Sequence, residues 1–361
     1  MKKKILFIAS HRKDRAPGQR FRFEQYFDYL NQKGITCELS FLVNEKNDKV
    51  LYKSGHYFSK LLIFIKSYLT RFRDVFHKND YDIIFIFREA LMTRSVFFEK
   101  QFRKSKAKLV FDFDDAIWHF DISEANKKFG WLKDPGKTAK IISMCDLIIA
   151  GNKYLADYAK HHNDNVVIVP TTIDTNEYVK VKFDKPETKI CIGWSGSITT
   201  IKHFEYALPF LKELKKKYGE KIYIKVIGDS TYENKELGIK GIAWNKENEI
   251  EELSTFDIGI MPLPDDEWAK GKCGLKGLQY MALEIPCVMS PVGVNSEIIS
   301  DGVNGYLANN NNEWVEKISL LIENQELRKQ IGTEARKTVE QKYSVNSQKE
   351  KYLSLLMGLL K

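Results

Sequence analysis

The residues whose types and spacing are best suited to binding a ligand lie between Lys270 and Ala308. A glycine-punctuated run there brings Lys270, Lys272 and Lys276 to the start of an expected helix. The helix dipole, unpaired backbone amides and ammonium groups would converge on one anion, and a diphosphate carries enough charge to engage them together. The candidate ligand-binding residues of this segment are Lys272, Cys273, Gly274, Leu275, Lys276 and Gln279. The alternative is that the lysines face solvent, although Lys272 and Lys276 would share a helix face if the helix begins early.

A second candidate for phosphate binding is the small-residue turn from Gly193 to Ser197, which connects an expected strand to an expected helix. Gly196 and Ser197 would present backbone amides, and Lys202 would add a positive charge nearby. The alternative is a tight strand-to-helix connection with a hydroxyl N-cap, which needs no ligand. The nearby lysine favours the functional interpretation.

The loop after the first expected strand, Arg12 to Phe23, contains Gly18 and Arg20 and precedes an expected helix at Phe23 to Leu30. Its backbone amides and arginines could bind a phosphate. No Gly-x-Gly-x-x-Gly or Walker pattern is present, so a solvated charged loop is an equal alternative.

Three carboxylates follow another strand, at Asp112, Asp114 and Asp115. They repel one another unless a cation, hydroxyl groups or arginines lie close by. No histidine or further acidic residue stands at metal spacing, so we expect no metal site and favour hydroxyl groups as partners. One Asp could instead serve as a helix N-cap. Asp114 and Asp115 are the acidic candidates for catalysis.

Composition narrows the class of protein and the compartment. Residues 1–180 carry 32 Lys/Arg against 22 Asp/Glu, a net charge of +10, whereas the remainder carries 25 against 26, a net charge of −1. No pattern for base readout accompanies this charge, so we expect no nucleic acid and favour an anionic membrane surface. Five scattered cysteines fit a reducing cytoplasm. We expect no signal peptide and no transmembrane helix, because no apolar run reaches about 18 residues.

Short β-branched and aromatic runs alternate with helix-period segments, which predicts an α/β fold with parallel sheets. The expected strands of the first half are Lys4 to Ala9, Ile35 to Leu42, Asp82 to Phe87, Lys108 to Phe113, Leu147 to Ala150 and Val166 to Val169. Those of the second half are Ile190 to Trp194, Ile222 to Ile227, Ile258 to Met261, Cys287 to Ser290 and Gly305 to Leu307. After Asn311 the chain is expected to be helical.

The aperiodic stretch from Pro170 to Lys189 holds two prolines and marks the expected domain boundary. We therefore expect an N-terminal domain over residues 1–175, a C-terminal domain over 188–340, and a helix over 341–361 that packs back across both. Each domain is expected to be a doubly wound parallel sheet.

Motifs in the second half resemble those of the retaining glycosyltransferases of family 4. They are Asp257-Ile-Gly-Ile-Met-Pro262, Leu278-Gln-Tyr-Met-Ala282, Ile285-Pro286, Ser290-Pro-Val-Gly293, Glu297-Ile-Ile and Asp301-Gly-Val-Asn-Gly305. Weaker similarity extends to Gly18–Arg22, Asp112–Trp118 and Gly193–Lys202. The resemblance implies a GT-B fold, in which two Rossmann-like domains face an interdomain cleft.

The resemblance also implies an activity of the bacterial polysaccharide type. A sugar would move from a nucleoside-diphosphate sugar, with UDP or GDP expected, to a glycan or lipid-linked acceptor with retention of anomeric configuration. That donor is a substrate, and no cofactor is expected. Lys202 and Lys276 would stabilise the leaving diphosphate, and Asp114 or Asp115 would orient the sugar or accept a proton. Trp244 stands where relatives contact the nucleobase, although a buried core tryptophan is an equal alternative.

The sequence departs from the family pattern at one place. Relatives commonly carry two glutamates separated by seven residues, and the corresponding positions here are Gly271 and Gln279. Gln279 can still bond a hydroxyl group, but it lacks the charge. A GT-B-shaped protein without catalysis, which binds a sugar nucleotide or nucleic acid, is therefore the alternative.

An apolar stripe in the first half could bind a membrane. It comprises Phe58, Leu61, Leu62, Ile65, Leu69, Phe72 and Phe76, with Lys60, Lys66, Arg71 and Arg73 expected mostly elsewhere around the helix. Core packing is the more frequent fate of such a stripe. Because this half is basic, we expect peripheral attachment to the inner face of the cell membrane.

Overall fold

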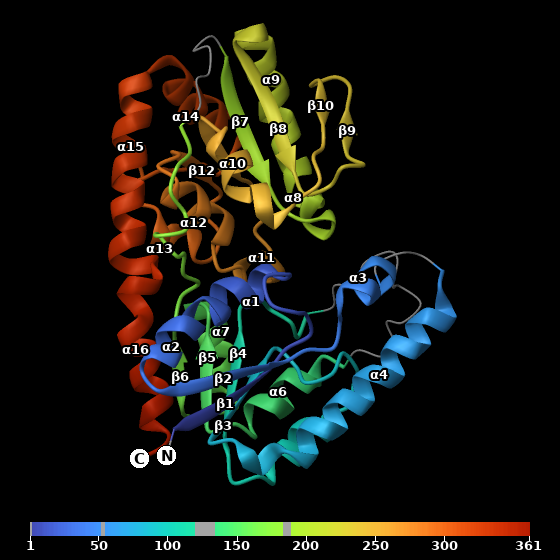
Figure 1. Ribbon diagram of the computed structural model, residues 1–361. Helices are drawn as coiled ribbons and strands as arrows, with labels where there is room; N and C mark the ends of the chain where they lie inside the picture. Colours follow the sequence, from blue (N-terminus) through green and yellow to red (C-terminus); the bar gives the residue numbers. More distant parts are fainter. Residues whose placement is uncertain (1, 52–54, 120–133, 183–188) are drawn as a thin grey trace. The chain divides into compact units, whose positions relative to one another are not determined.

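The computed structural model describes residues 2–51, 55–119, 134–182 and 189–361. The chain forms two compact units (Figure 1). Unit 1 comprises Met1–Thr171 and Lys349–Lys361, and unit 2 comprises Thr172–Gln348. Residue 188, at which the sequence places the start of the second domain, lies outside the described residues.

Unit 1 is built on a six-stranded parallel sheet with the order β2-β1-β3-β4-β5-β6. The strands are β1 (Lys3–Ile8), β2 (Ile35–Ser40), β3 (Ile83–Phe87), β4 (Lys108–Phe113), β5 (Leu147–Ala150) and β6 (Val166–Ile168). All six expected strands are present, with bounds that differ by at most two residues. The central strands β3, β4 and β5 are buried along almost their whole length, as their apolar runs predict.

The helices of unit 1 connect these parallel strands. They are α1 (Pro17–Arg22), α2 (Phe27–Gln32), α3 (Glu45–Leu51), α4 (Tyr57–Phe76), α5 (Phe97–Arg103), α6 (Gly136–Ile142) and α7 (Lys153–Lys160). The expected helix start at Phe23 was wrong, because the helix already begins at Pro17, whose fixed φ suits a first helical position. Gly18 and Arg20 therefore lie within a helix rather than in a loop.

The C-terminal helix α16 (Val345–Gly358) returns the chain to unit 1, since Lys349–Lys361 belong to it. The Tyr352 ring stacks on Tyr26 with centroids 4.4 Å apart and planes 4° apart. Both rings are buried, so this stack anchors the C-terminus in the unit.

Unit 2 contains a five-stranded parallel sheet with the order β13-β12-β11-β7-β8. The strands are β7 (Ile190–Ser195), β8 (Ile222–Ile227), β11 (Ile258–Met261), β12 (Cys287–Met289) and β13 (Tyr306–Leu307). The small antiparallel pair β9 (Glu233–Asn234) and β10 (Ile239–Lys240) was not predicted. Ile242 forms a single parallel bridge with Ile227.

The helices of unit 2 cover this sheet and extend to the end of the unit. They are α8 (Ile201–Phe204), α9 (Leu208–Tyr218), α10 (Glu249–Ser254), α11 (Glu267–Lys270), α12 (Leu275–Ala282), α13 (Asn295–Ile298), α14 (Asn311–Glu323) and α15 (Gln325–Thr338), followed by a π-helical turn at Val339–Tyr343. The helical character expected after Asn311 is confirmed.

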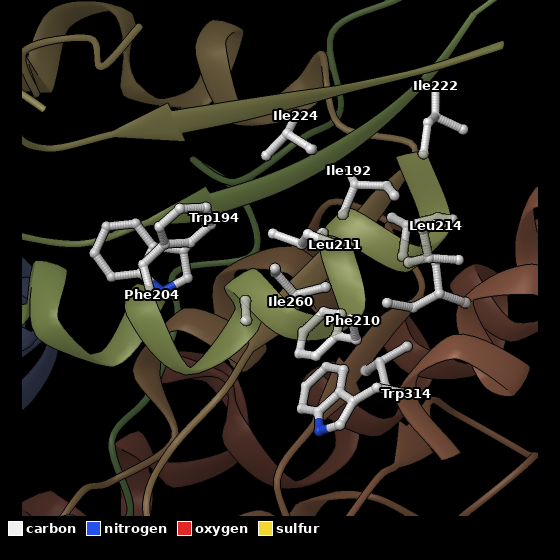
Figure 2. Close-up of a cluster of buried hydrophobic side chains, with 14 of the residues drawn as sticks. Ile192, Trp194, Phe204, Phe210, Leu211, Leu214, Ile222, Ile224, Ile260 and Trp314 are labelled. Carbon is white, nitrogen blue, oxygen red and sulfur yellow. The ribbon is translucent and has the colours of Figure 1, made fainter. Parts of the chain in front are cut away.

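One hydrophobic core joins the sheet of unit 2 to its helices (Figure 2). Trp194 of β7 packs on Phe204, and Phe210 of α9 stacks on Trp314 of α14 with centroids 4.5 Å apart. Trp194 is almost fully buried, so the end of β7 is fixed by packing. Across the described parts of the chain, no helix combines the length and the apolar character needed to cross a membrane.

Candidate functional site

The loops that follow β7, β8, β11 and β12 carry the candidate residues of unit 2. These strands are parallel neighbours, so their following loops emerge at the same edge of the sheet. The loops hold Gly196 and Ser197, Gly228, the run from Pro262 to Gly274, and the run from Ser290 to Val294. The predicted anion-binding residues of unit 2 therefore gather at one edge.

Two glycines bring the first two of these loops into direct contact. A Cβ on Gly228 would lie 2.4 Å from the carbonyl oxygen of Gly196, and the φ of Gly228 is +132°. A Cβ on Gly196 would in turn lie 2.1 Å from the Trp194 ring. No side chain fits at either position, so the backbone itself forms this surface.

The helix α12 begins at this edge of the sheet, at Leu275. Gly274 precedes it in the left-handed conformation, with φ of +69°, and within the described chain no side chain caps the helix. A Cβ at Gly274 would lie 2.3 Å from Ile298 Cδ1, so the loop after β12 fixes this turn. The amide nitrogens of the first turn, including that of Leu275, then point toward any bound anion.

The three lysines of this region have different surroundings. Lys270 pairs with Glu267 at 2.8 Å and with Asp265 at 3.7 Å, so its charge is already compensated. Lys272 Nζ lies 4.5 Å from the centroid of the Trp268 ring, and Lys276 Nζ lies 5.4 Å from that of Trp194. Because Gly196 also contacts Trp194, the structure brings Lys276 close to the loop after β7.

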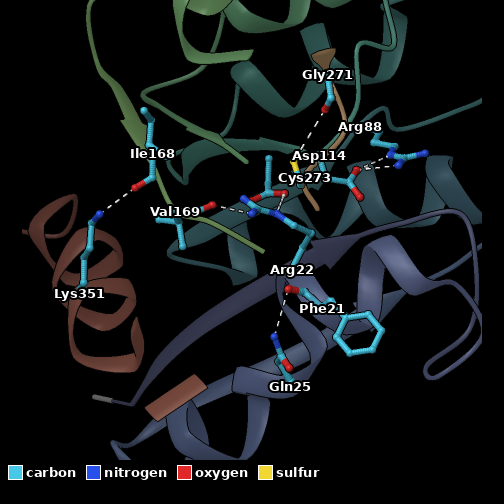
Figure 3. A network of polar contacts seen from close by, with 11 residues as sticks. Phe21, Arg22, Gln25, Arg88, Asp114, Ile168, Val169, Gly271, Cys273 and Lys351 are labelled. Atoms are coloured by element: carbon cyan, nitrogen blue, oxygen red, sulfur yellow. Dashed lines mark hydrogen bonds and ion pairs between the residues drawn. The ribbon is translucent and has the colours of Figure 1, made fainter. Parts of the chain in front are cut away.

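The helix begins at Leu275, so the early start that would have placed Lys272 and Lys276 on one helix face does not occur. Lys272 lies in the preceding loop, where Gly274 in the left-handed conformation ends the turn before the helix starts. The same loop holds Cys273, which is buried and whose Sγ lies 3.8 Å from the Gly271 carbonyl oxygen (Figure 3). Cys273 therefore lines the turn from inside.

The loop after β7 has the hydroxyl N-cap that the sequence left as an alternative. Ser197 and Thr200 form a reciprocal capping box, with the Ser197 amide donating to Thr200 Oγ1 at 2.9 Å. The cap satisfies the Ser197 amide, which reduces its availability to a phosphate. Lys202 lies one turn further on, in α8, and is exposed.

Gln279 and Trp244 meet through a residue that sequence reasoning did not single out, Glu249 of α10. Gln279 Nε2 donates to Glu249 Oε1 at 3.2 Å, and Trp244 Nε1 donates to the same oxygen at 2.8 Å. Trp244 is only partly buried, so it is not a core tryptophan. Nothing in the local sequence of Glu249 marks it as a site residue.

Asn295 is a second candidate that its local sequence does not reveal. Its Nδ2 donates to the Ser290 carbonyl oxygen at 3.0 Å, and among the described residues its buried Oδ1 has no hydrogen-bond partner. A Cβ on Gly274 would lie 3.6 Å from that oxygen, so Asn295 Oδ1 is close to the start of α12. A buried amide oxygen without a donor is a candidate acceptor, and its position next to α12 makes it part of the candidate site.

The carboxylates of unit 1 divide into a structural one and two candidates. Asp112 is fully buried and accepts from Arg22 Nε at 3.0 Å and from Arg22 Nη2 at 2.7 Å, while Arg22 Nη1 donates to the Val169 carbonyl oxygen (Figure 3). Burial raises the pKa of Asp112, and the charge of Arg22 opposes that rise. Asp112 thus holds α1 to the sheet.

Asp114 and Asp115 lie together beside Arg88, another residue that the sequence did not indicate. Arg88 Nη2 is 2.7 Å from Asp114 Oδ1 and 4.0 Å from Asp115 Oδ2. The φ of Arg88 is +62°, a strained conformation for a side-chain-bearing residue at the end of β3. Arg88 therefore offsets the repulsion between the two carboxylates, and an arginine was one of the partners that the sequence left open.

Gly18 lies against the same carboxylates, because a Cβ there would be 2.8 Å from Asp114 Oδ2. Arg20, in the same short helix, is buried, and its guanidinium lies 4.9 Å from the centroid of the Phe21 ring. Gly18 thus belongs to the carboxylate cluster of unit 1, and Arg20 is packed into that unit. No group of three or more potential metal ligands occurs in the described ranges.

Residues 175–338 match the family model described as "Glycosyl transferases group 1". An uncharacterized glycosyltransferase of Methanocaldococcus jannaschii is 46% identical over 61 residues, which cover 16% of this chain and 17% of that protein. The aligned stretch thus spans less than a fifth of that relative. Unit 2 therefore contains a group 1 glycosyltransferase domain.

Solved structures resemble the chain over nearly its whole length. A glycosyltransferase from Rickettsia africae has a TM-score of 0.69 at 16% identity and covers 100% of this chain and 99% of its own. Sucrose-phosphate synthase from Thermosynechococcus elongatus has a TM-score of 0.74 at 12% identity, with 99% of each chain covered. Anabaena HepE in complex with UDP-glucose has a TM-score of 0.62 at 14% identity, covering 98% of this chain and 99% of its own. The expected GT-B fold, with two parallel-sheet α/β domains, is confirmed.

Proposed function

We propose that the protein transfers a sugar from a nucleoside-diphosphate sugar, with UDP or GDP as the carrier, to a glycan or lipid-linked acceptor. The start of α12 carries this proposal, because backbone amides, Lys272 and Lys276 face the same edge of the sheet. Cleavage of the sugar–phosphate bond builds negative charge on the diphosphate. Donors fixed in advance stabilise that charge more in the transition state than in the ground state.

Within this proposal, Lys276 is the principal donor to the leaving diphosphate, and Lys202 and Lys272 assist. Trp194 supports the Lys276 side chain, so little reorganisation is needed when charge develops. The acceptor hydroxyl loses a proton to Asp114 or Asp115. The family resemblance adds retention of anomeric configuration and a role in surface polysaccharide synthesis.

A thermal-shift panel of UDP-, GDP-, ADP- and TDP-sugars tests the donor, and release of free sugar or product from the stabilising donor tests transfer. We expect one or two nucleotides to raise the melting temperature and support turnover. A second candidate function, sugar-nucleotide binding without catalysis, is favoured by Gly271 and Gln279 where relatives have glutamates. Stabilisation by a nucleotide sugar without any turnover would support that second function.

We also propose that the protein works at an anionic membrane, on its cytoplasmic face, through helix α4. The polar residues Ser67, Arg71 and Asp74 are on the buried face of this helix, with Ile63. Arg71 lies away from the apolar stripe, as expected, but on the buried face of the helix, where its Nη1 donates to Asp74 Oδ2 at 2.8 Å. The pattern of a core-facing amphipathic helix is thus inverted in α4.

Large apolar side chains are exposed along the whole length of α4. They are Tyr57, Phe58, Leu61, Leu62, Phe64, Ile65, Leu69, Phe72 and Phe76, and the relative exposure of Phe76 is 84%. Phe97 of α5 extends this surface, since its ring centroid lies 5.9 Å from that of Phe72. Exposed apolar patches of this extent mark interaction sites.

Charge favours lipid as the partner of this surface. Asp74 is the only acidic residue between Gly55 and Lys78, and it is buried, whereas Lys66 and Arg73 are exposed. Each basic side chain near an anionic leaflet contributes about 1 kcal/mol, and each inserted large apolar side chain contributes up to roughly 1.5–3 kcal/mol. Such a surface supports reversible attachment beside a lipid-linked acceptor.

Liposome flotation tests the membrane proposal with F58S/L69S/F76S and a control, Y206S/V303S/L320S, which replaces three exposed apolar side chains elsewhere. We expect the wild-type and control proteins to float with anionic vesicles at low salt, and the α4 variant to remain in the dense fraction without vesicles. Equal recovery of all three proteins, or no flotation of the wild-type protein, would contradict the proposal.

A further inference from the structure

Four polar side chains of unit 2 form one hydrogen-bonded cluster beside α12. Tyr178 Oη donates to Glu249 Oε2 at 2.7 Å, and Trp244 Nε1 donates to Glu249 Oε1 at 2.8 Å. Gln279 Nε2 donates both to Tyr178 Oη at 2.9 Å and to Glu249 Oε1 at 3.2 Å. Glu249 is therefore the shared acceptor of three neutral donors.

The cluster is rigid because it is buried and anchored. Tyr178, Glu249 and Gln279 are all buried, so the carboxylate depends on these donors to offset its lost hydration. Arg336 of α15 donates to the Tyr178 carbonyl oxygen at 2.8 Å and also to that of Ala282, at the end of α12. The segment with Tyr178 and the helix with Gln279 are thus held together from outside the cluster.

The cluster fixes which way the Gln279 amide faces. Both of its N–H groups are directed at Glu249 and Tyr178, and the flipped amide would place its oxygen against the Glu249 carboxylate. Among the described residues, no group donates a hydrogen bond to Gln279 Oε1. That oxygen lies on α12 three residues after Lys276, on a neighbouring position of the same helix face.

We propose that Glu249 is a positioning residue that turns Gln279 Oε1 toward the donor substrate, where it accepts a hydrogen bond from a hydroxyl group. This inference rests on the proposed function, since a nucleoside-diphosphate sugar carries such hydroxyls on its ribose and its sugar. It also accounts for the glutamine at position 279. A glutamate there would place a second carboxylate about 3 Å from Glu249 in a buried setting, and the two charges would repel.

The test is a charge exchange between the two positions, with Q279E, E249Q and the double variant Q279E/E249Q. The stability of each ligand-free protein in urea tests the pair without reference to any nucleotide. We expect Q279E to be less stable than the wild-type protein above pH 7 and to recover as the pH falls, because protonation of one carboxyl removes the repulsion. The double variant, with one carboxylate and one amide again, should recover at all pH values.

Calorimetric binding of UDP, 2′-deoxy-UDP and UDP-glucose, and of the guanosine counterparts, tests the role of Gln279 Oε1. We expect Q279L to weaken binding of the favoured nucleotide at least 10-fold, and the double variant to bind within about 3-fold of the wild-type protein. If the ribose 2′-hydroxyl is the partner, binding of 2′-deoxy-UDP is insensitive to Q279L; if the 3′-hydroxyl is the partner, 2′-deoxy-UDP is as sensitive as UDP. If a hydroxyl of the transferred sugar is the partner, only binding of UDP-glucose is sensitive.

Two results would overturn the inference. Q279E could prove as stable as the wild-type protein at every pH, or the double variant could prove no better than Q279E. If the wild-type protein binds no nucleotide at all, the proposed function fails, and the urea series still reports separately whether the two positions are coupled.

Discussion

Lys276→Ala removes a charge that the fold holds next to the start of α12. The Lys276 ammonium lies 5.4 Å from the Trp194 ring centroid, and Trp194 is also in contact with Gly196. The charge is therefore set in place before any substrate binds. Removing one such preorganised donor costs about 10²- to 10³-fold in turnover, equivalent to roughly 3–4 kcal/mol of transition-state stabilisation.

Lys270→Ala, at the end of the preceding helix α11, is the matched control. Lys270 is compensated by Glu267 at 2.8 Å and Asp265 at 3.7 Å, so its loss should change turnover less than about 3-fold. The assay is steady-state transfer, or donor hydrolysis, with the nucleotide sugar that stabilises the protein most. Equal turnover of Lys276→Ala and the wild-type protein, or equal losses in both variants, would refute the reasoning.

Three further predictions concern stability and pH. Gly228→Ala should lower the free energy of unfolding in urea by about 3 kcal/mol, because its Cβ would lie 2.4 Å from a carbonyl oxygen. Gly238→Ala is the control: its φ is +66° and the space around it is open, so it should lower the free energy of unfolding by only about 1 kcal/mol. Asp112→Asn should lower the free energy of unfolding by roughly 3–5 kcal/mol, because it leaves the buried Arg22 without its carboxylate partner. An unchanged free energy of unfolding in urea would argue against a buried Arg22–Asp112 pair. Burial lowers the pKa of His11 from 6.5 to about 4. Between these pH values the unfolded chain binds a proton at His11 and the folded protein does not, so the free energy of unfolding should fall as the pH drops from 6.5 toward 4. His11→Leu should reduce this fall, and parallel curves of unfolding free energy against pH for the variant and the wild-type protein would contradict the prediction.

Much of the fold follows from local sequence. The strands of both sheets are short β-branched and aromatic runs between turns, and such runs have few other stable arrangements once helices cover them. The start of α1 was misplaced because Pro17, a good first helical residue, was interpreted as part of a loop. The two-residue strands β9 and β10 were missed because they are too short to show a period.

Candidate residues that depend on the local backbone could be predicted from the sequence, but contacts between residues distant in the sequence could not. The glycines of the loops and the lysines beside α12 are visible in the sequence. The pairing of Arg88 with Asp114 and the cluster around Glu249 arise from residues far apart in the chain. Local pattern also could not show that α4 turns its polar side chains inward, because a stripe has the same period whichever face is buried.

We expect the edge of the sheet at the start of α12 to bind the diphosphate of a sugar nucleotide. Calorimetric titration of the wild-type protein, Lys276→Ala and Lys270→Ala with UDP- and GDP-sugars measures this binding. We expect saturable binding of one of these sugar nucleotides, weakened at least 10-fold in Lys276→Ala and within about 3-fold of wild type in Lys270→Ala. Absence of binding to the wild-type protein, or binding that Lys276→Ala leaves unchanged, would contradict it.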